Sequence, residues 1–219
     1  MTAANQDQFI ALSALSSRQL ALRAQGRSLP AFAELVTRYE RRLFNFLLRR
    51  VPCASDAEDI VQEAFLRAWQ SIDRYDPTWE FSTWLYTIAR RLAANEMAAA
   101  RRRARYQAAT GANAQSTDPA QIVADRELQT NLWTIAQRVL NPDQQTALWL
   151  RYAEQMSVQD IAAILGRTGV SVRVLMFRAR RAIADEMTQI SGIRQPVRIK
   201  PDSMPEPKLP TARVVGGLR

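Results

Sequence analysis

The chain has 219 residues, of which 47% are apolar, and it carries a formal charge of +9 at neutral pH. This length can bury one sizeable core or two small ones, and the charge favours a polyanion such as a nucleic acid as partner. The sequence has no histidine and one cysteine, which excludes histidine-based catalysis, an intramolecular disulfide and the common zinc sites. We therefore expect no catalytic residue, no metal and no cofactor.

The N-terminal segment does not resemble a targeting sequence. Residues 1–29 lack an apolar stretch behind a basic start, and no apolar run approaches the roughly 18 residues that a bilayer span needs. A single unpaired cysteine also suits a reducing compartment. We therefore expect a cytoplasmic protein that does not insert into a membrane.

Apolar residues recur at spacings of three and four through most of the chain, which predicts an all-α fold. A long amphipathic helix is expected to begin at Ser28. The pair Ser55 and Glu58 has the spacing of a capping box and predicts the start of a second helix. A third helix is expected from about Phe81 to the arginine cluster at 101–105. These helices would form one domain.

Composition changes divide the chain into parts. Residues 107–124 include a small, polar stretch that predicts a flexible linker, and helical patterning resumes after it with a cap at Asn141. Residues 190–219 contain five prolines and several basic residues, which favours a disordered basic tail. The expected parts are an N-terminal extension at 1–17, a first domain at 18–106, the linker at 107–124, a second domain at 125–189 and the tail at 190–219.

The second domain contains a helix-turn-helix pattern. Ser157 and Asp160 cap a short helix, Gly166 supplies the turn, and another helix is expected to start near Thr168. Its outward residues would be Ser171, Arg173, Phe177, Arg178 and Arg181. Arginines on such a face can bond guanine edges or neutralise phosphates in a major groove. The alternative is an ordinary helical hairpin with a solvated basic face.

Acidic residues gather on one edge of the second expected helix. Asp56, Asp59 and Glu63 are spaced three and four apart, and Glu58 and Gln62 lie beside them. Such an edge is either solvated or meets a basic partner.

Aromatic and polar residues gather around the start of the third expected helix. Tyr75, Trp79 and Phe81 lie in a segment broken by a proline, and Trp84, Ile88, Arg91 and Asn95 follow at helical spacing. Unpaired bases stack on aromatic rings and on arginine planes, and an amide can read a base edge. This pattern indicates single-stranded DNA binding, although the aromatics could instead be core residues.

Two sets of motifs carry a family resemblance. The stretches FAELVTRYERRLF, DAEDIVQEAFLRAW and FSTWLYTIARR resemble region 2 of the extracytoplasmic-function sigma factors, a group of the sigma-70 family. The stretch LNPDQQTALWLRYAEQMSVQDIAAILGRTGVSVRVLMFRARRAI resembles their region 4. The resemblance covers about residues 18–187 and includes the order of the two regions and the linker between them. It implies a sigma-2 helical bundle joined flexibly to a sigma-4 helix-turn-helix domain.

The resemblance assigns roles to these residues. The core-polymerase-binding residues would be Asp56, Glu58, Asp59, Gln62 and Glu63, which would dock on the clamp helices of the largest subunit. The residues for melting minus-ten DNA and capturing its non-template strand would be Tyr75, Trp79, Phe81, Trp84, Arg90, Arg91, Asn95 and Arg101. The residues for reading duplex minus-35 DNA would be Ser171, Arg173, Phe177, Arg178 and Arg181. Region 4 would also bind the flap tip, and an anti-sigma factor would hold both domains.

Several positions depart from the family pattern. Arg91 stands where the family usually has Asn, Val170 and Gln155 where it has Gly, and Val174 and Leu175 where it has a polar and a basic residue. These changes affect the expected promoter preference rather than the polymerase-binding edge. We expect a promoter-reading transcription initiation factor and not an enzyme. Two rivals stay open: a helix-turn-helix regulator that acts without polymerase, and a sigma-like decoy that titrates an anti-sigma factor.

Overall fold

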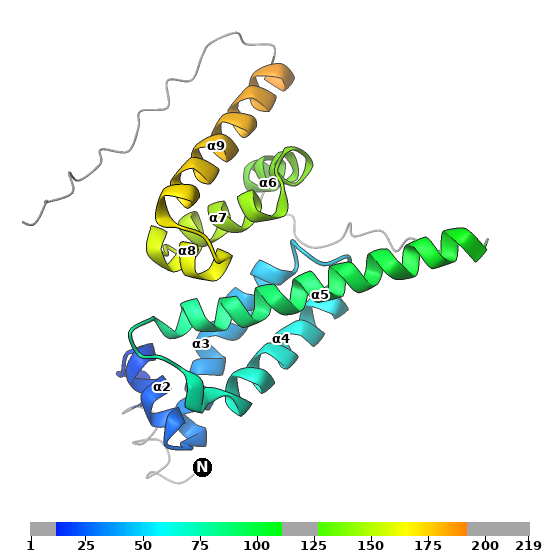
Figure 1. Ribbon diagram of the computed structural model, residues 1–219. Coiled ribbons are helices and arrows are strands. Elements are labelled where there is room, and N and C mark those ends of the chain that lie inside the picture. Colours follow the sequence, from blue (N-terminus) through cyan, green and yellow to red (C-terminus); the bar gives the residue numbers. More distant parts are fainter. Residues whose placement is uncertain (1–11, 111–126, 192–219) are drawn as a thin grey trace, which may run out of the picture.

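The computed structural model of the chain describes residues 12–110 and 127–191, and within those ranges it is helical with no strand (Figure 1). The helices form two groups, which confirms the predicted all-α class with two helical domains. The predicted parts that fall at 1–11, 111–126 and 192–219 lie outside the described residues.

The first group packs around a core of aromatic and aliphatic side chains. Its members are α2 (Ser17–Gln25), α3 (Leu29–Leu47), α4 (Ala54–Gln70), the short 3-10 helix η1 (Ile72–Arg74) and α5 (Phe81–Thr110). Leu35, Leu43 and Phe46 of α3 are completely buried, and Phe32 lies edge-on to Phe65 of α4. Burying each such side chain contributes about 1.5–3 kcal/mol, so the amphipathic stripe of α3 fixes its place in this domain.

The helix α2 was not predicted from the sequence. Its N-terminus is a complete capping box, in which the Ser16 hydroxyl accepts from the Gln19 backbone and the Gln19 side chain accepts from the Ser16 backbone. Leu20, Ala21 and Ala24 are fully buried against α3. The capping box is a sequence signal that would have located this helix.

The predicted start of α4 was wrong. Ser55 and Glu58 do not form a capping box, because the helix begins at Ala54, two residues before the start that a cap at Ser55 predicts. The extended cap residue is Cys53, which makes no side-chain capping bond. Ser55 is therefore already helical, and its hydroxyl lies 3.0 Å from the Cys53 sulfur instead.

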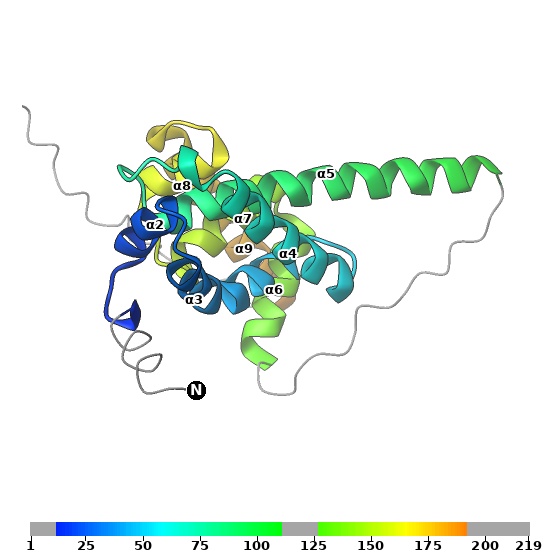
Figure 2. The same ribbon diagram turned by 90° about the horizontal axis from the view of Figure 1, so that it is seen from below.

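The helix α5 runs past the arginine cluster to Thr110, so the linker expected from residue 107 begins later. Alanines are frequent between residues 93 and 109, and alanine has the highest intrinsic helix propensity, which explains how the helix continues without a supporting core. Figures 1 and 2 both show its C-terminal half extending away from the other helices. Side chains 101–106 are exposed there.

The second group consists of α6 (Glu127–Val139), α7 (Pro142–Tyr152), α8 (Val158–Leu165) and α9 (Gly169–Ser191). The predicted caps are confirmed: Asn141 forms a capping box with Gln144, and the Ser157 hydroxyl accepts from the Asp160 backbone. Gly166 adopts the left-handed conformation, with φ of 64°, at the turn between α8 and α9. The helix-turn-helix geometry follows from these local signals, and α9 continues two residues past the predicted end of the domain.

Gln155 has a φ of 58°, in the left-handed region that favours glycine. A residue with a Cβ costs about 1–2 kcal/mol in this conformation, which gives a physical reason to expect glycine at this position. The turn is retained because Met156, the next residue, is buried and donates its backbone N–H to the Leu150 carbonyl.

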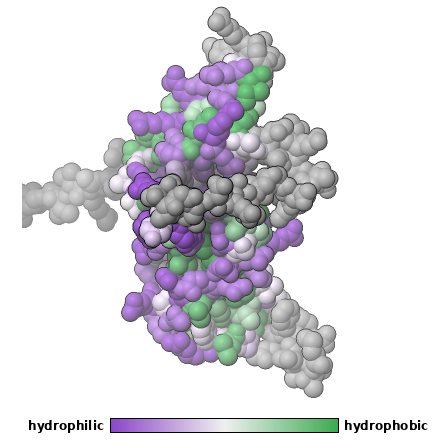
Figure 3. Space-filling model, turned by 90° about the vertical axis from the view of Figure 1, so that its right-hand side faces the viewer, coloured by the Kyte–Doolittle hydropathy of each residue, from purple (hydrophilic) through white to green (hydrophobic). Residues whose placement is uncertain are grey.

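The described surface on the side drawn in Figure 3 is mainly hydrophilic. Hydrophobic surface occurs there in separate areas between larger hydrophilic ones. Across residues 12–110 and 127–191, no helix has the combination of length and apolar character that a bilayer crossing requires.

Candidate functional site

The acidic residues of α4 point away from its packed face. Ala57, Ile60, Val61, Ala64 and Phe65 are buried against α3 and α5, and this stripe turns the opposite edge outward. We call the residues Asp56, Glu58, Asp59, Gln62 and Glu63 the α4 edge. Glu58, Asp59 and Gln62 are exposed, and Asp56 and Glu63 are half-buried.

The α4 edge has few partners of its own. Glu63 accepts from Arg67 at 2.5 Å, within the same helix. Leu66, which the sequence analysis did not single out, is 50% exposed and lies one turn beyond Gln62 and Glu63. In the part of the chain that the structure describes, no hydrogen bond or ion pair joins α4 to the second group. The edge therefore offers carboxylates and one apolar side chain to a partner.

The aromatic residues of the loop before α5 serve two purposes. Tyr75 and Phe81 are buried, and their rings lie 5.5 and 5.9 Å from that of Trp84. The Tyr75 hydroxyl donates to the Trp79 carbonyl at 2.7 Å, and burial raises the Tyr75 pKa to about 12, so this donor persists at neutral pH. Tyr75 and Phe81 thus anchor the loop, while Trp79 is 39% exposed.

A pocket of about 170 Å³ opens beside this loop. Its lining residues are Arg74, Asp76, Trp79, Thr83, Trp84 and Thr87 of the first group and Ala163 of α8. Aromatic walls with a few polar groups suit a planar, hydrogen-bonding ring such as a nucleobase. Sequence reasoning found the two tryptophans but missed the polar members, which are spread over η1, the loop and α5.

We call the volume lined by these residues the loop pocket. It is covered in part by α8: Ala163 supplies one wall, and the Thr83 hydroxyl donates to Asp160 at 2.9 Å. Thr83 is only 3% exposed as a result. Access to this end of the pocket therefore depends on the position of the second group.

The polar residues further along α5 do not share one environment. Arg91, Asn95 and Arg101 are exposed and stay available to a ligand. Arg90 instead turns toward the second group, where it donates to Asp143 at 3.1 Å and to the Ile164 carbonyl at 3.4 Å. In this arrangement Arg90 is an interdomain contact.

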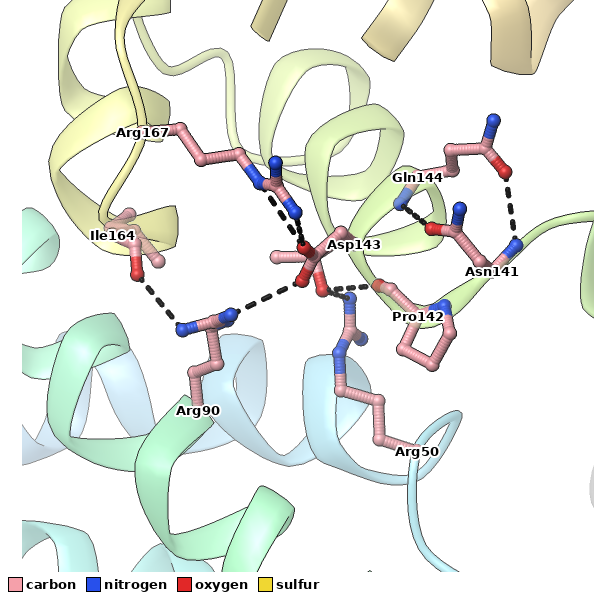
Figure 4. Close-up of polar contacts among 9 residues, drawn as sticks. Arg50, Arg90, Asn141, Pro142, Asp143, Gln144, Ile164 and Arg167 are labelled. Carbon is pink, nitrogen blue, oxygen red and sulfur yellow. Dashed lines mark hydrogen bonds and ion pairs between the residues drawn. The ribbon is translucent and has the colours of Figure 1, made fainter. Parts of the chain in front are cut away.

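Asp143, at the first turn of α7, is the centre of a polar cluster between the two groups (Figure 4). It accepts from Arg90 and, within its own group, from Arg167 at 2.6 Å. Burial alone would raise the Asp143 pKa, but the hydrogen bonds from Arg167 and Arg90 hold it below its ordinary value. Close by, Arg50 donates to the Thr146 hydroxyl at 3.1 Å.

Further contacts join the groups. Glu154 accepts from Arg42 of α3 at 2.7 Å, and its side chain is only 3% exposed. The Arg49 guanidinium lies 5.2 and 4.9 Å from the ring centres of Trp133 and Trp149. The interface is thus rich in charged and polar contacts, which is typical of domains that can separate.

The outward face of α9 carries the predicted cluster of basic residues. Val172, Met176 and Ala179 are buried against α7 and α8, which leaves Arg173, Phe177, Arg178 and Arg181 exposed and Ser171 half-buried. The Thr168 hydroxyl caps the helix by accepting from the Ser171 backbone at 3.2 Å. Arg173 and Arg178 form no ion pair with any described residue, and Arg181 is 3.8 Å from Asp185.

Family models match both groups of helices. Residues 35–104 match the model of sigma-70 region 2, and residues 138–183 match that of sigma-70 region 4. The two matches follow the order of the helical groups, and each falls within one of them.

Curated relatives match most of the chain. The RNA polymerase sigma-H factor of Pseudomonas aeruginosa is 32% identical over 176 residues, which cover 76% of this chain and 91% of the relative. The ECF RNA polymerase sigma-E factor of Escherichia coli K12 is 32% identical over 183 residues, covering 79% of this chain and 95% of the relative.

Solved structures have a similar fold. CnrH in complex with the cytosolic domain of CnrY is similar with a TM-score of 0.58 and 25% identity, over 79% of this chain and 97% of the other. RpoE in complex with the anti-sigma factor NepR from Bartonella quintana is similar with a TM-score of 0.59 and 22% identity, over 75% of this chain and 98% of the other.

Proposed function

The chain belongs to the extracytoplasmic-function sigma factors of the sigma-70 family, and from this premise we propose how it directs RNA polymerase to promoters. Sigma factors are transcription initiation factors and not enzymes. We assign region 2 to residues 18–106, the linker to 107–124 and region 4 to 125–189. The 1–17 extension and the 190–219 tail flank these domains.

The observation that carries the proposal is the combination, in one domain, of an acidic edge without a partner in the second group and an aromatic pocket. The α4 edge docks on a basic surface of core polymerase, the clamp helices of its largest subunit. Complementary charge speeds such association and selects the partner. Region 4 makes a second contact, with the flap tip. A regulator that binds DNA without polymerase needs no such edge.

The loop pocket receives a flipped base of the non-template minus-ten strand. Trp79 and Trp84 stack on it, while Tyr75 and Phe81 hold the loop from within the core. Asn95 reads a base edge, since an amide both donates and accepts.

Arg91 takes a different role at the same face. A guanidinium has donors only, so Arg91 serves as a phosphate clamp and stacking plane beside the melted strand. Arg101, exposed two turns beyond Asn95, adds a further phosphate contact. Arg90 can join them only when region 4 moves away, because it is bound to Asp143 in this arrangement.

The helix-turn-helix reads duplex minus-35 DNA. The exposed face of α9 enters the major groove, where Arg173 and Arg178 meet guanine edges or phosphates. Ser171, Phe177 and Arg181 line the same face. If Arg173→Ala lowers the affinity for some duplex sequences more than for others, Arg173 reads a base. If it lowers the affinity for all sequences alike, Arg173 contacts a phosphate.

The closed arrangement of the two domains is an inactive form. Ala163 and Asp160 of α8 cover one side of the loop pocket, so region 4 must part from region 2 before minus-ten DNA enters. An anti-sigma factor is the expected partner of this form, since RpoE from Bartonella quintana, which has a similar fold, was solved in complex with the anti-sigma factor NepR.

Run-off transcription with purified core polymerase tests the function. A sigma factor yields promoter-specific transcripts that core alone does not make. A regulator acting without polymerase binds duplex DNA but adds no transcripts. A decoy binds an anti-sigma factor and also adds none, and either result would reject the proposal.

A further inference from the structure

An apolar stripe runs along the exposed face of α9. Val170, Val174 and Phe177 are 68%, 44% and 55% exposed, and their spacing of four and three places them on one side of the helix. The core of the domain does not need them, because Val172, Met176 and Ala179 fill it from the opposite side. We call these three exposed residues the α9 stripe.

Positive charge surrounds the α9 stripe. Arg173 lies on one flank of the stripe and Arg178 on the other. Arg181 lies on the same side of the helix as the stripe, one turn beyond Phe177. No acidic residue occurs in α9 before Asp185. Cations on both flanks favour a polyanion as the occupant over the apolar face of a second protein, whose burial would desolvate them.

The chemistry of the major groove identifies what the stripe can read there. Most groups that base edges present in that groove are hydrogen-bond donors or acceptors, and valine and phenylalanine can satisfy neither. The exception is the C5-methyl group of thymine, which takes apolar contacts. Each methyl that leaves water against a valine or a phenyl ring adds favourable burial.

We infer that Val170, Val174 and Phe177 read thymine methyl groups in the minus-35 element, while Arg173 and Arg178 anchor the flanking phosphates or guanines. This inference rests on the proposed function and adds the base type to it. Because three exposed apolar side chains share this helix face, we expect the minus-35 element to contain more contacted thymines than a polar face would select.

Replacing thymine by deoxyuridine removes the methyl and leaves the base pair intact. The probe is a promoter duplex selected from a randomised minus-35 library by the full chain bound to core polymerase, with its thymines replaced one at a time. Each contacted methyl should contribute roughly a three- to fivefold change in affinity, the range expected for one buried carbon. A selected element without thymine would overturn the inference at once.

Val174→Ala links the effect to one side chain. The variant should bind the thymine duplex more weakly and should lose sensitivity to deoxyuridine at one position only. Ile190→Ala is the matched control, because Ile190 is an exposed apolar residue at the far end of the same helix. Its sensitivity to deoxyuridine should equal that of the unaltered chain. Circular dichroism would verify that both variants remain helical.

The outcomes separate the two proposals. If the chain supports promoter-specific transcription but every deoxyuridine duplex binds as well as its thymine parent, the inference is wrong and the sigma function stands. In that case, a Val174→Arg variant that no longer binds an anti-sigma factor, or no longer self-associates, would identify a protein as the occupant of the stripe. If no transcript depends on the chain, the function itself fails, and the inference fails with it.

Discussion

The α4 edge and the loop pocket lie in the same domain, but only the pocket is in contact with region 4. The edge makes no hydrogen bond or ion pair with a described residue of α6–α9, whereas the Thr83 hydroxyl beside the pocket donates to Asp160, and Ala163 forms part of the pocket wall. In the proposed function, one domain thus presents its polymerase-binding edge while its DNA-binding pocket is partly covered. The difference suggests an order of events, in which polymerase can be engaged before the promoter strand is captured.

The largest expected effect concerns the α4 edge, the exposed surface in this comparison. Asp59→Lys places a positive charge against a basic partner, where a close unfavourable pair costs several kcal/mol. Binding to core polymerase should fall by orders of magnitude in a fluorescence titration. Glu40→Lys is the matched control, because it reverses an exposed acid of α3 outside the α4 edge. Equal affinities for the two variants would refute the docking assignment.

The next largest effect concerns the loop pocket, which region 4 partly covers. Trp79→Ala removes a stacking surface worth about 1–3 kcal/mol per base, so affinity for single-stranded minus-ten DNA should fall roughly 5- to 150-fold. Binding to core should not change, because Trp79 lies outside the α4 edge. Leu22→Ala, which shortens an exposed apolar side chain of α2, should change neither affinity. A parallel loss of core binding in the Trp79 variant would show that the two surfaces are not separate.

The smallest effect concerns the contact between the domains. Glu154→Gln keeps the shape of a side chain that is 3% exposed but removes its charge opposite Arg42. A loss of about 1 kcal/mol would make the parted form roughly fivefold more populated. Affinity for single-stranded minus-ten DNA should rise by that factor. Asp73→Asn, which removes an exposed ion pair within region 2, is the control and should leave the affinity unchanged.

Local sequence signals predicted much of the fold. The caps at Asn141 and Ser157 and the turn at Gly166 depend on neighbouring residues only, and the structure has each of them as expected. The start of α4 was missed by two residues because a Ser–Glu spacing recurs inside helices as well as before them. The length of α5 was underestimated because small residues were read as linker, although alanine also favours helix.

The interdomain contacts could not be predicted from patterns. Arg90 falls within a basic, DNA-like stretch, and nothing in its own helix indicates that Asp143, 53 residues later, is its partner. The same holds for Thr83 and Asp160, which are 77 residues apart. Residue spacing locates a helix face, but tertiary packing decides whether solvent, DNA or another domain meets that face.

A reversible cross-link between the domains tests the central claim most directly. Cysteines introduced by Thr83→Cys and Asp160→Cys in a Cys53→Ser background would be joined by a short, reducible thiol linker, since the native side-chain oxygens lie 2.9 Å apart. Core binding and promoter melting, the latter followed by 2-aminopurine fluorescence at minus-ten, would be measured before and after reduction. We predict that the linked protein binds core through the α4 edge, remains sensitive to Asp59→Lys and melts the promoter only after reduction. Equal melting by the linked and reduced forms would contradict the account.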